Sequence, residues 1–259
     1  MSAIDPAEHR RRQLVSLSGQ EGVYFQDGLV TGHNHDFMKD PAFAAAYARG
    51  VQAAGGTDYG WHWRVHVGLW AAQTALQVSG DFVECGVNAG FLSSAIMQRL
   101  GWNALGRSFW LLDTFDGIDP RFVTDDERAD GIMEKDRQRK ELGFYVEGGL
   151  AAARRNFAEW PSARIVDGAI PESLPRLGAE RIAFLHIDLN CAMPEVAALE
   201  HCWPRLVPGA VILLDDYAFR GYHHQKRAMD AAAARLGVAI ASLPTGQGLA
   251  IRGGGVPAR

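Results

Sequence analysis

From residue 82 onward, short apolar segments alternate with segments of helical periodicity, and no other feature constrains the fold as strongly. The periodic segments carry apolar residues three or four positions apart, as at Leu92, Ile96 and Leu100, which is typical of amphipathic helices. The apolar segments predict five strands, at residues 82–85, 109–113, 164–167, 182–188 and 210–215. Strands separated by helices form parallel sheets covered on both faces, so we expect an α/β fold.

The end of the chain adds a different pattern to this sheet. Two more short apolar segments, 239–243 and 249–252, are joined by a turn-rich stretch that contains Pro244, Gly246 and Gly248, and this predicts an antiparallel hairpin. We therefore expect a Rossmann-like, mostly parallel seven-stranded sheet that ends in a hairpin. This is the outline of class I methyltransferases, although dinucleotide-binding proteins share much of it, so architecture alone does not decide function.

Two segments lie outside this core. The first 80 residues predict a helical N-terminal cap over the cleft, with one helix from about Pro41 and another whose apolar face carries Val65, Leu69, Ala72 and Leu76. Residues 81–259 form the remaining domain. Within it, the charged stretch 119–149 is either a surface insertion or a lid over the substrate, because it follows the second strand on the side where open α/β sheets bind ligands.

Composition and charge exclude several classes of partner. The formal net charge of −4 lacks the basic surface that nucleic-acid binding needs. No apolar stretch approaches a signal peptide or a membrane span, so we expect a soluble, cytoplasmic protein that does not bind membranes. The cysteines are odd in number and lack metal-ligand spacing, which argues against disulfides and a zinc site; they are Cys85, Cys191 and Cys202.

A glycine-containing loop follows the first predicted strand and opens a helix. Its residues Glu84, Gly86, Asn88 and Gly90 would let the backbone approach a nucleotide or sulfonium cofactor, with helix-start amides facing the ligand. Such turns also occur where a helix only packs tightly. Asp113 ends the second strand, where its carboxylate would accept hydrogen bonds from ribose hydroxyls; the alternative is a turn cap before Thr114.

The third strand ends at the same edge of the sheet. Asp167 and Gly168 are therefore candidates for an adenine pocket, with Phe115 beneath or beside the base. Phe115 is equally consistent with plain core packing, and Asp167 with a turn former before Gly168.

Three aspartates end the fourth and fifth strands. If those strands are neighbours, about 4.8 Å apart, Asp188, Asp215 and Asp216 converge at one edge of the sheet. Crowded carboxylates repel each other unless a cation lies among them, and oxygen ligands alone favour magnesium. Asn190 is a further candidate ligand. Each aspartate taken singly is also consistent with a helix cap.

Longer motifs around these residues carry a family resemblance. They are Leu112-Asp-Thr-Phe-Asp-Gly117, Ile187-Asp188 followed by Glu200 and Leu206-Val-Pro-Gly209, and Leu213-Leu-Asp-Asp-Tyr217. Over residues 80–252 the chain resembles the macrocin O-methyltransferase family of metal-dependent sugar methyltransferases. One departure concerns Asn190, where family members often carry a second acidic residue.

The resemblance implies an S-adenosylmethionine-dependent, magnesium-assisted O-methyltransferase that acts on a sugar or glycoside hydroxyl. It implies that Glu84, Gly86 and Asp113 hold S-adenosylmethionine and that the three aspartates bind magnesium. Asp188 is then also a candidate base, as are His223 and His224, which follow the Asp-Asp-Tyr turn and could reach the cleft, although an exposed pair is the commoner outcome. Imidazole is the side chain that most readily takes a proton near neutrality. His186, inside a predicted strand, is expected to be structural.

Two rival functions remain open at this stage. Tyr222 and Lys226 match the Tyr-x-x-x-Lys spacing of NAD(P)-dependent short-chain oxidoreductases, but that class carries its glycine loop near the N-terminus. The second rival is a non-catalytic relative that binds the cofactor or a partner protein but transfers no methyl group. An aromatic N-terminal segment with Trp61, Trp63 and Trp70 suits either the core or a homo-oligomer interface.

Overall fold

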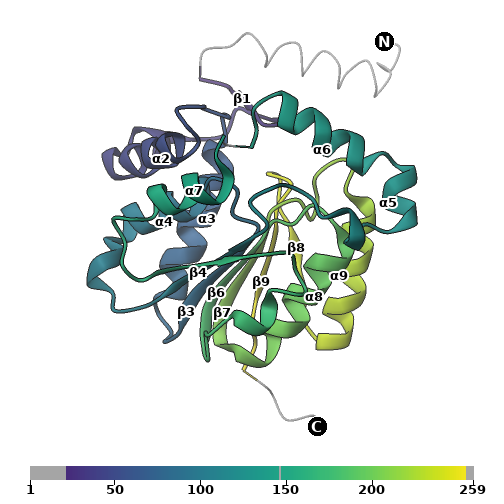
Figure 1. Cartoon of the computed structure of the whole chain (residues 1–259). Coiled ribbons are helices and arrows are strands. Elements are labelled where there is room, and N and C mark those ends of the chain that lie inside the picture. The colour runs from purple at the N-terminus through teal and green to yellow at the C-terminus, as the bar shows by residue number, and fades with distance from the viewer. Residues whose placement is uncertain (1–21, 146, 255–259) are drawn as a thin grey trace, which may run out of the picture.

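The computed structural model describes residues 22–145 and 147–254 and confirms the predicted mostly parallel seven-stranded sheet (Figure 1). Its strand order is β5-β4-β3-β6-β7-β9-β8. The first five strands in this order are parallel, and β9 is antiparallel to β7 and β8, as the predicted C-terminal hairpin requires. The strands are β3 (Asp81–Cys85), β4 (Phe109–Asp113), β5 (Ala163–Asp167), β6 (Ile182–Ile187), β7 (Leu206–Leu214), β8 (Ala241–Ser242) and β9 (Gly248–Ile251).

Helices cover both faces of this sheet because alternate strand residues point to opposite sides (Figure 1). Phe82 and Phe184 belong to the core on one face, and Val83 and Leu185 to the core on the other. The first core includes α2 (Pro41–Ala53), α3 (His62–Ala75), α4 (Phe91–Leu100) and α7 (Gly149–Asn156). The second includes α8 (Ala192–Cys202) and α9 (His223–Leu236). Short 3-10 turns lie at Trp102–Ala104, Leu174–Arg176 and Trp203–Arg205.

The N-terminal segment contains the two predicted helices but is more than a cap. Helix α3 packs directly on β6 and β7, and α2 packs on α4, so both helices belong to the main layer. A hairpin that the sequence analysis did not predict precedes them, formed by β1 (Tyr24–Gln26) and β2 (Leu29–Thr31), with a 3-10 turn at Asp36–Lys39. Residues 1–21 of the predicted cap lie outside the described residues.

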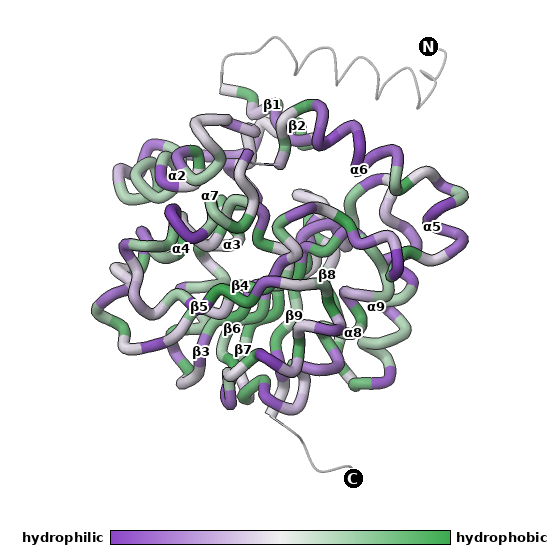
Figure 2. The backbone as a smooth tube through the Cα atoms, viewed as in Figure 1, coloured by the Kyte–Doolittle hydropathy of each residue, from purple (hydrophilic) through white to green (hydrophobic). Residues whose placement is uncertain are grey.

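The charged 119–149 segment forms a 3-10 turn (Pro120–Phe122) and two helices, α5 (Asp125–Ala129) and α6 (Ile132–Glu141). Figure 2 shows that α5 and α6 are hydrophilic, whereas the strands are mostly hydrophobic. Thr124 and Glu127 form a capping box that begins α5. Glu127 also accepts a hydrogen bond from the amide of Ala192, which ties the segment to α8.

No helix in residues 22–145 and 147–254 is long and apolar enough to cross a membrane.

Candidate active site

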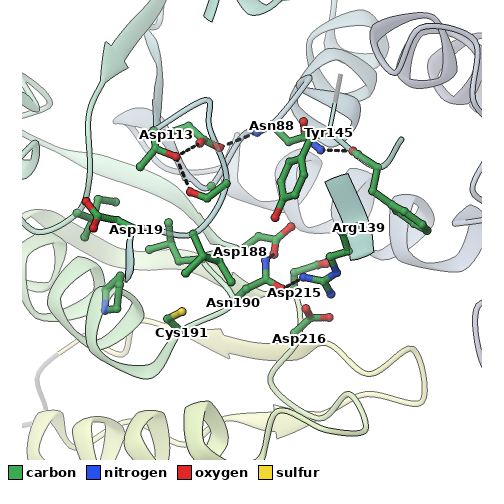
Figure 3. A pocket seen from close by; sticks show the side chains of 18 of the residues that line it. Asn88, Asp113, Asp119, Arg139, Tyr145, Asp188, Asn190, Cys191, Asp215 and Asp216 are labelled. Carbon is green, nitrogen blue, oxygen red and sulfur yellow. Dashed lines mark hydrogen bonds between the residues drawn. The ribbon is translucent and has the colours of Figure 1, made fainter. Parts of the chain in front are cut away.

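A cavity of about 610 Å³ lies at the carboxyl edge of β3, β4, β6 and β7 (Figure 3). This volume lies within the usual range for small-molecule sites. The loops that follow these strands form its floor, while the N-terminal segment and the 119–149 segment contribute the remaining walls. Of the predicted site residues, those that line the cavity are Gly86, Asn88, Asp113, Thr114, Gly168, Asp188, Asn190, Asp215 and Asp216.

Asp113 holds the glycine loop in place. Its Oδ2 accepts hydrogen bonds from the amides of Val87, at 2.5 Å, and Asn88, at 2.7 Å. Its Oδ1 accepts from the amide of Phe115 at 2.7 Å and from the hydroxyl of Thr114 at 3.3 Å. The hydroxyl of Thr114 has a single proton and lies closer to the main-chain oxygen of Gly117, at 2.7 Å, so the three amides are the firm donors to Asp113. In this structure Asp113 thus has the capping role that the sequence left open. The loop amides that were expected to face a ligand bind Asp113 instead.

Gly86 is where the loop leaves β3 and passes close to the backbone after β6. Its φ is +91°, in the left-handed region that favours glycine. A Cβ at this position would lie 1.8 Å from the main-chain oxygen of Asp188. The same residue therefore lets the glycine loop and the first aspartate of the acidic trio lie side by side.

Four predicted cofactor residues do not line the cavity. Glu84 is buried within β3, where its Oε1 lies 2.9 Å from Nδ1 of His186. Gly90 packs against Phe157. Phe115 packs against the hydrophobic core, and the exposed Asp167 ends β5. Glu84 is thus buried away from the cavity, whereas Phe115 also lines a smaller pocket beside Asn88 and Asp113, where it can contact a ligand.

The predicted acidic trio is brought together, because β6 and β7 are parallel neighbours. Asp188 follows β6, and Asp215 and Asp216 follow β7. Each offers a carboxylate oxygen within 4.8 Å of the others. Three acidic groups at this spacing are mutually repulsive unless cations compensate them.

The three carboxylates differ in how their charge is compensated. Burial raises the pKa of Asp188 well above its ordinary value, and repulsion by Asp215 and Asp216 adds to this. Burial and repulsion by Asp215 raise the pKa of Asp216 to about 6. Burial also acts to raise the pKa of Asp215, but Arg64 and His186 outweigh it and hold that pKa well below its usual range.

Arg64, which the sequence analysis did not identify, is the reason for this difference. Its side chain, 8% exposed, lies 2.6 Å from Oδ2 of Asp215, 3.4 Å from Oδ1 of Asp216 and 2.6 Å from Oδ2 of Asp27. Asp215 Oδ1 also accepts a hydrogen bond from Gln247 at 3.1 Å. Asp215 is therefore already bound on both oxygens, whereas Asp188 and Asp216 each keep an oxygen without a hydrogen-bond partner among the described residues.

These residues fit a divalent cation. All three offer hard oxygen ligands that lie within 4.8 Å of one another, and burial together with mutual repulsion raises the pKa of Asp188 and Asp216, which a bound cation would relieve. Arg64 compensates mainly Asp215, so a cation would be bound most directly by Asp188 and Asp216.

A second arginine lines the same cavity. Arg139 of α6 donates from NH1 to Oδ1 of Asn190 at 2.5 Å and from NH2 to the hydroxyl of Tyr222. Asn190 in turn donates from Nδ2 to Oδ1 of Asp188 at 3.1 Å. This chain of contacts orients Asp188, and Asn190 itself has a φ of +61°, which asparagine tolerates better than most residues.

His223 and His224 are not brought to the cavity. Both begin α9 and lie at its outer side, where His224 Nε2 is 2.9 Å and His223 Nε2 is 3.4 Å from Oδ2 of Asp130. The prediction that they reach the cleft is therefore corrected, because the first turn of α9 directs them toward α5. His186 is buried against Glu84, in accord with its predicted structural role.

Tyr222 and Lys226 do not act as a pair. The hydroxyl of Tyr222 accepts from Arg139, whereas Nζ of Lys226 bonds to Asp230 and Tyr217. The contacts give no support to the oxidoreductase interpretation.

Aromatic side chains form the upper wall between the N-terminal segment and the 119–149 segment. Tyr59 stacks on Trp61 and on Phe144, with ring centroids 4.3 and 5.2 Å apart. The main-chain oxygen of Phe144 accepts hydrogen bonds from Nδ2 of Asn88 at 2.7 Å and from Tyr59 at 3.4 Å. Both segments thus enclose the glycine loop.

Comparisons with known proteins agree with this geometry. Residues 70–234 match the family model for macrocin-O-methyltransferase (TylF). Curated relatives include mycinamicin III 3''-O-methyltransferase of Micromonospora griseorubida, 29% identical over 147 residues that make up 54% of this chain and 56% of the relative. Another is 8-demethyl-8-(2,3-dimethoxy-alpha-L-rhamnosyl)-tetracenomycin-C 4'-O-methyltransferase of Streptomyces olivaceus, 31% identical over 148 residues, 54% of each protein. The chain spans about half the length of the curated relatives it matches.

Solved structures extend the likeness to the fold. The O-methyltransferase NovP aligns with a TM-score of 0.65 at 20% identity, over 85% of this chain and 100% of NovP. The calicheamicin methyltransferase CalS11 aligns with a TM-score of 0.59 at 18% identity, over 98% and 95% of the two chains. These alignments confirm the predicted class I methyltransferase fold.

Proposed function

The chain belongs to the macrocin O-methyltransferase family, and from this premise we propose that it methylates a hydroxyl of a sugar or glycosylated small molecule, using S-adenosylmethionine and magnesium. The observation that carries the proposal is that one cavity contains both the glycine loop and the acidic trio. The named relatives act on sugar-bearing natural products, which supports this class of acceptor.

For the cofactor half of the site, we propose that Gly86, Asn88, Thr114 and Gly168 contact S-adenosylmethionine, which supplies an electrophilic methyl group. Asp113 fixes the loop through three amides, and because the hydroxyl of Thr114 lies closer to the Gly117 carbonyl, Oδ1 of Asp113 can also accept a hydrogen bond from a ribose hydroxyl. Gly168 has no side chain to narrow the cavity beside Ala169 and Ile170, which supply apolar surface for a base.

For the acceptor half, Asp188 and Asp216 would hold magnesium, with Asp215 fixed by Arg64 beside them. Magnesium supplies Lewis acidity, which lowers the pKa of an alcohol. Asp188, oriented by Asn190 through Oδ1, is the residue best placed to take a proton at its other oxygen. Holding two reactants in a reactive geometry contributes roughly 7–11 kcal/mol of barrier lowering, so positioning is the main task of these side chains.

We further propose that the 119–149 segment acts as a lid. Its residues Arg139, Phe144 and Tyr145 line the cavity, and Tyr145 is held by a 2.6 Å hydrogen bond to Asp136 on the same segment. Phe144 contacts both Tyr59 and Asn88, so release of these contacts would open the cavity above the glycine loop.

Transfer of a labelled methyl group to a panel of glycosides, with magnesium present or removed by chelator, tests the proposal. We expect transfer to need magnesium and to fall about 10²- to 10⁴-fold in Asp188→Asn. Calorimetry with S-adenosylmethionine and with NAD separates the rival functions. Binding of NAD alone would indicate an oxidoreductase, and cofactor binding with no transfer to any acceptor would indicate a non-catalytic relative.

A further inference from the structure

Arg139 is a cation on the cavity wall that has no carboxylate partner in the part of the chain that the structure describes. No acidic oxygen lies within 4.0 Å of its guanidinium in residues 22–145 and 147–254. Its two hydrogen bonds go to neutral groups, the amide of Asn190 and the phenol of Tyr222. Since a guanidinium has five N–H donors, three remain available for a ligand.

The contrast with Arg64 shows that this is not the general condition of the cavity. Arg64 is enclosed by Asp27, Asp215 and Asp216, so its charge is fully used within the protein. Arg139 is only half-buried and lines the same cavity, where it lies beside Asn190 (Figure 3). An arginine left half-buried without a counter-charge is a common device for binding phosphate or carboxylate groups.

Among the described residues, no acidic side chain of the cavity pairs with Arg139 within 4.0 Å, although Asp188 and Asp216 act on it through space. Asp113 is bound by loop amides, Asp58 by Tyr47 and the amide of Gly60, and Asp119 by Arg121. Asp188 and Asp216 are the remaining pair, and the two negative charges of that pair are matched by one divalent cation. With the proposed magnesium bound by Asp188 and Asp216, no carboxylate among the described residues pairs directly with Arg139. Magnesium, Arg64 and Arg139 together equal the charge of Asp27, Asp188, Asp215 and Asp216, so the guanidinium offers unpaired N–H donors and not a surplus charge.

Position 190 reinforces this conclusion. The side-chain amide oxygen of Asn190 accepts a hydrogen bond from NH1 of Arg139 at 2.5 Å. An aspartate at position 190 would pair with the guanidinium and neutralise its charge. The left-handed backbone at this position, with φ +61°, suits aspartate as well as asparagine. With asparagine at position 190, Arg139 stays a charged hydrogen-bond donor, although the backbone there would also accept an aspartate that could form an ion pair with it.

We propose that the acceptor carries an oxyanionic group, a phosphate ester or a carboxylate, close to the hydroxyl that is methylated, and that Arg139 binds this group. This inference rests on the proposed methyl transfer and narrows its acceptor to anionic sugars. Asn190 and Tyr222 hold the guanidinium in position, and the oxyanion takes the donors that they leave unused.

The test compares three acceptors that differ only in charge: a methyl hexopyranoside, the corresponding hexose 1-phosphate and the corresponding hexuronate. The ratio of kcat/KM for the anionic acceptor to that for the neutral one is measured for the wild type and two variants. We expect the wild type to prefer an anionic acceptor. Arg139→Gln and Asn190→Asp should each lower the ratio about 10- to 100-fold, because a charge-assisted hydrogen bond is lost.

Arg137→Gln is the matched control. Arg137 lies on the same helix but is exposed and paired with Glu134 and Glu141, outside the cavity. We expect it to leave the ratio unchanged. The phosphate and uronate arms identify which oxyanion is preferred.

A binding measurement keeps the inference testable apart from catalysis. Calorimetry measures the affinity of the hexose 1-phosphate and of the neutral hexoside for protein that is saturated with magnesium and S-adenosylhomocysteine. The inference is supported if the wild type binds the hexose 1-phosphate more tightly than the hexoside and Arg139→Gln loses this difference. Equal binding of both sugars, or a ratio that Arg139→Gln leaves unchanged, overturns it. Absence of methyl transfer to every acceptor would instead count against the proposed function, and the binding result would still decide the role of Arg139.

Discussion

Asp113→Asn should destabilise the protein even when no cofactor is present. Three backbone amides, those of Val87, Asn88 and Phe115, donate to the Asp113 carboxylate. An asparagine oxygen can replace one carboxylate oxygen, but its NH₂ group then faces the remaining amide donor. One buried N–H is left unsatisfied, at about 1–3 kcal/mol, and two charge-assisted bonds become neutral ones.

The sum is a loss of about 2–4 kcal/mol in the free energy of unfolding, against a total of roughly 5–15 kcal/mol for a typical protein. At this chain length the melting temperature should fall by about 5–15 °C. Urea denaturation of the cofactor-free protein measures the change. Asp116→Asn is the control, because the Asp116 side chain is 95% exposed in the same turn. If Asp113→Asn keeps wild-type stability and loses only S-adenosylmethionine affinity, the carboxylate is a ribose ligand and not a clamp for the loop.

Three further predictions concern stability and can be measured by denaturation. Gly86→Ala should lower the free energy of unfolding by about 2–5 kcal/mol, because its backbone is left-handed and the new Cβ would clash with the carbonyl of Asp188. Gly101 is the control: its φ is also positive but its surroundings are open, so Gly101→Ala should lose only the free energy that a left-handed alanine backbone costs. Arg64→Met should lose about 3–5 kcal/mol because it leaves buried carboxylates without a counter-ion, and a near-neutral result would refute that role. Burial raises the pKa of Glu195 to about 8. Protonated Glu195 therefore adds to the free energy of unfolding, and this contribution should be fully present below pH 4.5 and lost as the pH rises toward 8. Glu195→Gln should remove the fall in the free energy of unfolding between pH 4.5 and 8. If the variant loses stability over this pH range just as the wild type does, Glu195 is not the group responsible.

The sequence predicted the residues at strand ends well, for a physical reason. Parallel strands place their carboxyl ends along one edge of a sheet, so Asp113, Asp188 and Asp215 share that edge. Asp188 and Asp215 lie together because β6 and β7 are neighbours, a condition that the sequence left open. Gly86 and Gly168 follow from the same rule. What the sequence did not reveal is which strand residues face each other. Glu84 lies opposite His186 in the β3–β6 register, and that pairing buries it beneath the cavity.

The residues that sequence reasoning missed are long side chains from elements distant in the chain. Arg64 reaches a carboxylate 151 positions away, and only its place on an otherwise apolar helix face signalled a buried partner. Arg139 reaches Asn190 from a helix whose charged sequence indicated a solvated surface. The β1–β2 hairpin had a signal that was overlooked, since Asp27-Gly28 is a common two-residue hairpin turn.

The two arginines divide the cavity into a fixed half and an adaptable half. Arg64 lies on α3, a helix built into the core, and its bonds to Asp27 and Asp215 hold the acidic trio whether or not a ligand is present. Arg139 lies on α6, in the segment proposed to act as a lid, and its bonds to the neutral groups of Asn190 and Tyr222 leave N–H donors for an acceptor. Closing the segment would therefore bring Arg139 to the acceptor and, through Asn190, orient Asp188 in the same movement. Recognition of the acceptor and placement of the base would thus depend on a single side chain.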